Sequence, residues 1–299
     1  MKRFLFICML LLAPHTGAHA TLSIFACEPE WAALAKELGG DRIEVFSATT
    51  AQQDVHHIQA RPSLIAKLRR ADLLVCTGSD LEVGWLPILL RRASNPNVLP
   101  GTRGYLEAAH YVPLLEKPEH IDRSQGDVHP QGNPHIHLDP RNIAAVAEVI
   151  AKRLSEIDPQ HQAEYQKRHE DFATRWRDAL TAWEKKAAPL QGVPIIVHHN
   201  AWVYLSNWLG LKVTGVLEPK PGVPPSSTHL GRLLDGFQQQ PASMIIRAPY
   251  QNPRASDWLS QRTGAPVVML PYSVGGSDEA RDIFGLFDDT IQRLLDATS

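Results

Sequence analysis

The sequence predicts an α/β protein with two lobes, each built on a mainly parallel sheet, that are joined by one long rigid α-helix. Three observations support this fold class. Short apolar runs alternate with amphipathic stretches early in the chain, one helical pattern of about 30 residues follows, and the alternation then begins again. We therefore expect a first lobe at 21–158, a linking helix at 159–189 and a second lobe at 190–299.

The first lobe is expected to alternate strands and helices, as a parallel sheet with helices on both faces requires. Apolar runs predict strands at 22–26, 43–46 and 72–76. Amphipathic stretches predict helices at 30–38, 62–70 and 81–92. The segment 101–133 is rich in glycine, proline and charge, so we expect a loop there with room for one strand.

A long helix is predicted to connect the lobes. Asp139-Pro140 precedes a helix at 141–157, and Asp158-Pro159 then restarts a second helix that runs to about Ala187. Apolar residues recur on one face of this second helix, namely Tyr165, Phe172, Trp176, Leu180 and Trp183. At ~1.5 Å per residue the helix is about 40 Å long, which suggests a rod between two lobes.

The second lobe repeats the layout of the first without repeating its sequence. Strands are predicted at 194–197, 211–216, 243–247 and 267–270. Helices are predicted at 201–209, 227–239, 252–263 and 283–297.

The first twenty residues have the pattern of a secretory signal peptide. Lys2 and Arg3 precede the apolar run Phe4–Ala13, which is shorter than the roughly 20 residues that a bilayer requires. Ala18-His19-Ala20 has the small-x-small pattern of a cleavage site. We expect cleavage after Ala20 and a periplasmic protein without stable membrane insertion; an uncleaved N-terminal anchor is the alternative.

The composition of the chain limits the kinds of partner that it is expected to bind. A formal charge of -2 argues against a nucleic-acid partner, which would favour a basic surface, and we expect a monomer. The 14 histidines stand out, since histidine is the commonest metal ligand. Cys27 and Cys76 remain after cleavage, each late in a predicted strand. An oxidising compartment permits a disulfide between them if the strands are neighbours, and two buried thiols are the alternative.

Histidines occur in three segments at the edges of predicted elements. His56 lies shortly before a helix, His135 lies before another helix, and His199 follows a strand. Ligands in open α/β sheets bind beyond the carboxyl ends of strands. A lone histidine is more often an ordinary surface residue, but three such segments together predict a metal site. Imidazole nitrogen suits zinc.

These segments resemble motifs of the zinc- and manganese-binding solute-binding proteins of bacterial ABC importers, a family that includes metal-binding lipoprotein adhesins. The resemblance covers essentially all of the mature chain. Its motifs here are Asp54-Val55-His56 with Pro62-Ser63, then Asn133-Pro134-His135-Ile136-His137-Leu138-Asp139-Pro140, and His199-Asn200-Ala201-Trp202-Val203-Tyr204.

The resemblance implies that His56, His135 and His199 bind the metal in a cleft between the lobes. A histidine at the third position resembles the zinc members, whereas manganese and iron members place a carboxylate there. Zinc, rather than manganese, is thus the expected cargo and an ABC permease the expected partner. The protein is expected to capture zinc and deliver it for import, and not to be an enzyme.

The chain departs from the family pattern at the fourth ligand. The family places an aspartate near the end of a late strand, but the stretch 267–273 contains no acid. Asp278, in the following glycine-rich loop, is the candidate. Water, His57 or Glu218 are the alternatives.

Other histidines have no assigned role. His137 stands where the family usually has an aromatic residue, and the functions of His57 and His198 are left open. His120, His129 and His137 lie in or beside the middle loop, where zinc members often carry a histidine-rich segment. This segment is short and sparse, so an ordinary exposed loop is expected.

Two other kinds of function fit parts of the sequence. A periplasmic metal chaperone or an adhesin could use the same fold. His135-Ile136-His137-Leu138-Asp139 matches the H-x-H-x-D core of metallo-β-lactamase-like hydrolases, but Pro140 occupies the position of the next histidine. No general base stands beside a metal as in H-E-x-x-H, so a zinc-dependent hydrolase is the weaker alternative.

Overall fold

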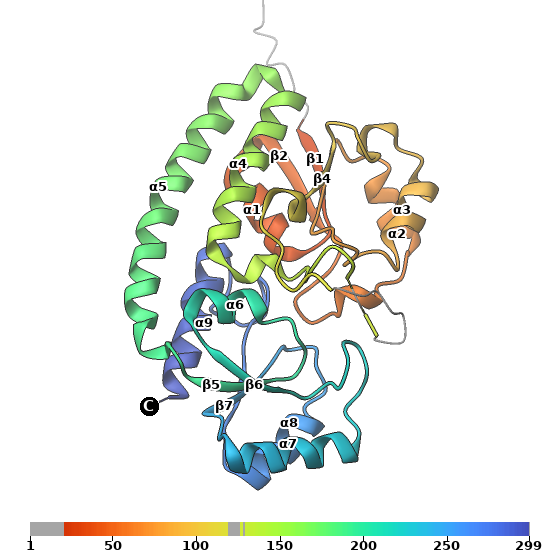
Figure 1. The fold of residues 1–299 in the computed structure, drawn as a ribbon. Coiled ribbons are helices and arrows are strands. Elements are labelled where there is room, and N and C mark those ends of the chain that lie inside the picture. The colour runs from red at the N-terminus through yellow and green to blue at the C-terminus, as the bar shows by residue number, and fades with distance from the viewer. Residues whose placement is uncertain (1–20, 119–125, 128, 299) are drawn as a thin grey trace, which may run out of the picture.

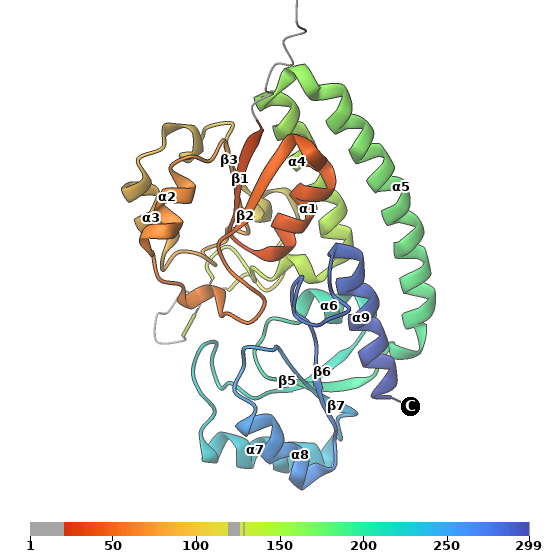
Figure 2. The ribbon, with the colours of Figure 1, turned by 180° about the vertical axis from the view of Figure 1, so that it is seen from behind.

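The computed structural model describes residues 21–118, 126–127 and 129–298. The predicted signal peptide, residues 1–20, and His120 lie outside the described residues. The described chain forms two α/β lobes, and helix α5 (Gln162–Ala187) runs along one side of both (Figures 1 and 2). The predicted fold class is therefore confirmed. No helix in these ranges is both long and apolar enough to span a bilayer.

The first lobe contains a four-stranded, all-parallel sheet in the order β2-β1-β3-β4. Its strands are β1 (Leu22–Ala26), β2 (Ile43–Ser47), β3 (Leu73–Cys76) and β4 (Tyr105–Glu107). The helices that belong to it are α1 (Pro29–Gly39), α2 (Pro62–Leu68), α3 (Leu86–Ala93) and α4 (Pro140–Ile157). Short 3-10 turns are η1 (Gly40–Arg42), η2 (Val55–His57), η3 (Pro96–Val98), η4 (Ala108–Tyr111) and η6 (Ile136–Leu138).

The second lobe repeats this topology, with a parallel sheet in the order β6-β5-β7-β8. Its strands are β5 (Pro194–Val197), β6 (Lys212–Val216), β7 (Met244–Arg247) and β8 (Val267–Met269). Its helices are α6 (Val203–Leu209), α7 (Ser227–Gln239), α8 (Arg254–Thr263) and α9 (Ile283–Asp296). The 3-10 turns η7 (Pro159–His161) and η8 (Ala188–Leu190) flank α5. In both sheets the strand order reverses beside the first strand, where ligands of such folds bind.

Helix α3 begins five residues later than the predicted start at Leu81. The Glu82 carboxylate accepts hydrogen bonds from the backbone N–H of Thr77, at 2.7 Å, and of Gly78, at 3.1 Å. Ser79 and Asp80 both have positive φ, so the chain after β3 forms a tight loop. This loop therefore occupies the residues predicted to form the first turn of the helix.

Helix α5 packs into the core instead of standing apart as a bare rod. Its inner face buries Tyr165, Phe172, Trp176 and Trp183, as the apolar stripe predicted, and leaves Leu180 half-buried. The Trp176 ring lies 4.8 Å from the Phe284 ring of α9, measured between centroids. One continuous apolar core takes in residues of β1 and α1 in the first lobe and of β5 and α9 in the second. The two lobes therefore share a core.

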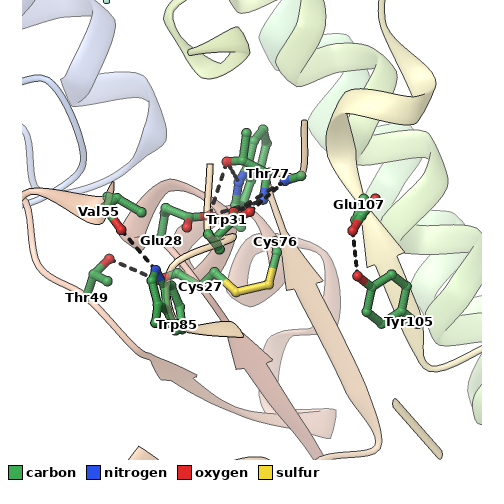
Figure 3. The surroundings of a disulfide bond; sticks show 12 residues. Cys27, Glu28, Trp31, Thr49, Val55, Cys76, Thr77, Trp85, Tyr105 and Glu107 are labelled. Atoms are coloured by element: carbon green, nitrogen blue, oxygen red, sulfur yellow. Dashed lines mark hydrogen bonds between the residues drawn. A yellow bond between two sulfur atoms is a disulfide. The ribbon is translucent and has the colours of Figure 1, made fainter. Parts of the chain in front are cut away.

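A disulfide joins Cys27, just after β1, to Cys76 at the end of β3, which settles the alternative that the sequence left open (Figure 3). The two strands are neighbours in the sheet, and the Cα atoms are 4.8 Å apart. Glu28 and Glu82 are buried close by. Burial, followed by the charges of Glu82 and Glu30, raises the pKa of Glu28 well above its usual range. Burial likewise raises the pKa of Glu82 to about 7.

Candidate metal centre

Three histidines that are far apart in the sequence meet between the lobes. His56 lies in η2, His135 immediately before η6, and His199 two residues beyond β5. Their ring centroids are 5.6 Å apart for His56 and His135, 5.7 Å for His56 and His199, and 5.4 Å for His135 and His199. One nitrogen from each ring lies within 4.8 Å of the others. We call these residues the three-histidine group.

In each of these rings the Nδ1 atom is held by an oxygen. His56 Nδ1 is 2.8 Å from Asp54 Oδ1, and His199 Nδ1 is 2.6 Å from Glu218 Oε2. His135 Nδ1 is 2.8 Å from the Tyr272 hydroxyl. Metal-binding histidines ordinarily use their second nitrogen in this way, because the outer partner fixes the ring and its tautomer. The Nε2 atoms are therefore the ones left to bind a metal, and His56 Nε2 is buried without a hydrogen-bond partner.

The outer partners are themselves built into the local fold. Asp54 also accepts a hydrogen bond from the His56 backbone and so starts the η2 turn. Glu218 Oε2 accepts a further bond from the backbone N–H of Gly222, which ties His199 to the proline-rich loop after β6. The carboxylates thus orient two imidazoles from opposite lobes.

Tyr272 follows β8, in the stretch that lacks the acid expected there. It has a φ of 63°, and its ring packs edge-on to those of His135 and His137. Its role at the site was not predicted from the sequence. The Pro-Tyr pair at the end of a late strand, where the family pattern has its aspartate, is the one feature that could have pointed to it.

Asn133 fastens the segment of His135 to that of His199. Its side-chain oxygen accepts from the His135 backbone N–H at 3.1 Å, and its amide nitrogen donates to the Asn200 carbonyl at 2.8 Å. An acid, which the family usually has at this position, could not donate the second bond while ionised. This departure from the family pattern therefore serves the contact between the lobes.

The structure does not bring Asp278 into the three-histidine group. Asp278 is exposed, and its carbonyl accepts from Arg281. The neighbouring Ser277 hydroxyl donates to Asp289 of α9, which fixes the loop against that helix. Within the described residues, no carboxylate belongs to the group.

The residues considered as alternative fourth ligands also lie or bind elsewhere. Glu218 holds His199 Nδ1, as described above. His57 is 63% exposed in its side chain, and its Nε2 faces Asp127 at 3.9 Å. His198 is buried, with Nε2 3.9 Å from Glu218 Oε1.

Two of the three metal-binding residues of the hydrolase-like motif make structural contacts instead. His137 Nε2 is 3.0 Å from the Tyr272 carbonyl, and Nδ1 is 3.3 Å from Glu30. Asp139 caps α4 and pairs with Arg141. Of the motif's three metal-binding positions, only His135 faces the group.

Burial of His135 favours cation binding at this ring. Burial, followed by the nearby His199 and His56 rings, lowers the pKa of His135 well below its usual range, so this imidazole is neutral and its lone pair is free. A cavity of about 760 Å³ borders His56 and His199 and gives solvent access to the site. The arrangement suits one tetrahedral zinc ion with nitrogen ligands.

His129 does not sit in an ordinary exposed loop, contrary to expectation. It is half-buried, and its ring centroid is 5.4 Å from that of His56. Burial, followed by His56, lowers the pKa of His129 to about 4. Its place beside the group could not be predicted, because the sequence does not show how the middle loop folds.

The two lobes, the long helix and the histidines between them, together with a family match over nearly the whole chain, define a two-lobed solute-binding protein of the metal-binding type. The chain belongs to the family described as zinc-uptake complex component A, periplasmic (ZnuA), whose sequence model matches residues 24–297.

Individual relatives agree with this assignment. The high-affinity zinc uptake system protein ZnuA of Brucella abortus is 33% identical over 137 residues, which are 44% of this chain and 40% of that protein. The chain thus spans less than half the length of this relative. The manganese ABC transporter substrate-binding lipoprotein scaA of Streptococcus gordonii is 27% identical over 62% of this chain and 61% of its own length. A crystal structure of ZnuA superimposes with a TM-score of 0.79 at 22% identity, covering 94% of this chain and all of that one.

Proposed function

We propose that the protein is a periplasmic solute-binding protein that captures zinc and delivers it to the permease of an ABC importer. The observation that carries the proposal is the three-histidine group, with each Nδ1 held by an oxygen and with ligands from both lobes. Family membership supports it.

The ligand chemistry favours zinc over manganese. Imidazole suits zinc, whereas manganese prefers carboxylate, carbonyl and water oxygens. The relatives include proteins named for either metal, so the choice for this chain rests on its ligands. His56, His135 and His199 are the proposed ligands.

The shared core suggests how the lobes respond. Because apolar side chains of both lobes and of α5 pack in one cluster, closure on the ion should be small. Zinc would draw His56 and His199 together, and the permease would recognise the closed form. Residues 1–20 would direct secretion and be removed.

The direct test is a metal titration on residues 21–299 stripped of metal. We expect one zinc to bind tightly and manganese weakly. His199→Ala should weaken zinc binding at least about 100-fold, since loss of even an outer partner typically costs 10- to 100-fold. The matched control is His110→Ala, which removes a surface histidine paired with Glu107.

Two results would refute the proposal. One is a wild-type protein that binds no zinc, and the other is a His199→Ala protein that binds it normally. The alternative of a metal chaperone is separated by deletion in cells: loss of zinc uptake supports the importer, and loss of metal from one target enzyme with uptake intact supports the chaperone. The adhesin alternative is not favoured by the family assignment.

A further inference from the structure

The space beside the three-histidine group contains one more imidazole. The 5.4 Å separation of the His129 and His56 ring centroids is as short as the separations within the group itself. His129 lies outside the set of nitrogens that are within 4.8 Å of one another, so it flanks the group on the side of His56. There it lines a cavity of about 540 Å³ together with His56.

A closed set of hydrogen bonds orients the His129 ring. Its Nδ1 is 3.0 Å from the Ser79 carbonyl oxygen, the Ser79 hydroxyl donates to the Gly132 carbonyl, and the Gly132 N–H donates back to the His129 carbonyl. A carbonyl can only accept, so Nδ1 carries the hydrogen of this bond. In the neutral ring the lone pair is then on Nε2.

This is the arrangement found in the three-histidine group. In all four rings an oxygen occupies the Nδ1 side, and a backbone carbonyl is a common outer partner of metal-bound histidine. His57, the other histidine on this side, lacks it: its side chain is 63% exposed and faces only the distant Asp127 carboxylate. The fold thus orients the ring of His129, but not that of His57, as it orients the rings of the three proposed ligands.

Three imidazoles leave one position of a tetrahedral zinc ion open. No described carboxylate joins the group, and the loop of Asp278 is fixed against α9 by the Ser277–Asp289 bond. We propose that His129 moves toward His56 when zinc binds and supplies the fourth ligand through Nε2, in place of water. This inference rests on the proposed function and makes the site one of four imidazoles.

The experiment counts imidazoles on the bound zinc by X-ray absorption and measures affinity in parallel. Wild type should show four imidazoles. His129→Gln should show three with one oxygen, and its affinity should fall on the order of 10- to 100-fold. The matched control His57→Gln should keep four imidazoles and wild-type affinity.

A second variant gives a positive reading that a folding defect cannot imitate. His129→Cys, loaded with cobalt in place of zinc, should show a thiolate-to-cobalt charge-transfer band, because cysteine binds such metals through sulfur. His57→Cys should show none.

The outcomes separate the two proposals. If wild type binds zinc through three imidazoles, and His129→Gln binds it with equal affinity, the four-imidazole inference is overturned while the proposed function stands. Absence of the band in cobalt-loaded His129→Cys would also overturn it. If wild type binds no zinc at all, the proposed function itself fails.

Discussion

The two lobes share one strand order but differ in how firmly their outer layers are packed. In the first lobe, α2 and α3 bury Leu64, Leu68, Leu86 and Leu89 against the sheet, and the disulfide crosses beneath them. In the second lobe, α7 buries only Leu230, and other apolar side chains of α7 stay half-buried. The same topology therefore supports one stiff and one looser lobe. The proposed ligands His56 and His199 come one from each.

The largest expected difference concerns the disulfide, since the second lobe contains no cysteine. Replacing both Cys27 and Cys76 by alanine should lower the free energy of unfolding by about 4 kcal/mol, because the bond closes a loop with a sequence separation of 49. Urea unfolding of the oxidised wild type and the double variant measures this. An unchanged midpoint would mean that the first lobe owes its stiffness to packing alone.

A smaller difference is expected between the outer helices. Leu89→Ala in α3 removes a fully buried side chain and should cost about 3 kcal/mol. Leu233→Ala in α7, which is half-buried, should cost about 1 kcal/mol. Thermal or urea unfolding of the two single variants compares them. Equal losses would break the contrast between a stiff and a loose lobe.

A third expected difference is a pH dependence of stability that arises in the first lobe. The folded pKa of Glu82 is about 7, raised by burial from 4.5, and that of Glu28 is also raised. The folded state therefore holds more protons than the unfolded state between about pH 4.5 and 7, so this stabilisation is complete below 4.5 and is lost as the pH rises through 7.

Glu82→Gln should reduce that loss, since it removes one of the two buried acids. The free energies of unfolding of wild type and Glu82→Gln are compared at pH 5 and pH 8. Relative to wild type, the variant should be more stable at pH 8 than at pH 5. His135 acts in the opposite direction: its folded pKa is lowered, so its contribution is lost as the pH falls below about 6.5. That contribution is common to both proteins and cancels in the comparison.

Local pattern was enough to predict most elements of the fold. Strands 22–26 and 194–197 and helix 227–239 match the structure at both ends. The strands are short, bounded apolar runs, and the apolar residues of the helix recur at helical spacing. The start of α3 was missed because a side chain, Glu82, displaces the first helical turn by binding backbone N–H groups. That competition depends on the folded loop and leaves no trace in periodicity.

Only those residues of the candidate site that stand in recognisable motifs could be predicted from the sequence. His56, His135 and His199 stand in recognisable segments, and the structure brings them together. Tyr272 and His129 could not be found in this way, because their proximity to the group depends on how distant loops cross the cleft. Asp278 was predicted because it is the next acid after the family's aspartate position, whereas the Ser277–Asp289 bond sets where its loop lies.

The core that α5 shares with both lobes has a consequence for the chain as a polypeptide. If the chain were divided in the loop between η8 and β5, the first fragment would carry Trp176 and Trp183 without their partners Phe284 and Phe287. Neither fragment could then cover its own apolar surface. The halves of this protein should behave as complementing fragments, insoluble apart and folded only when mixed.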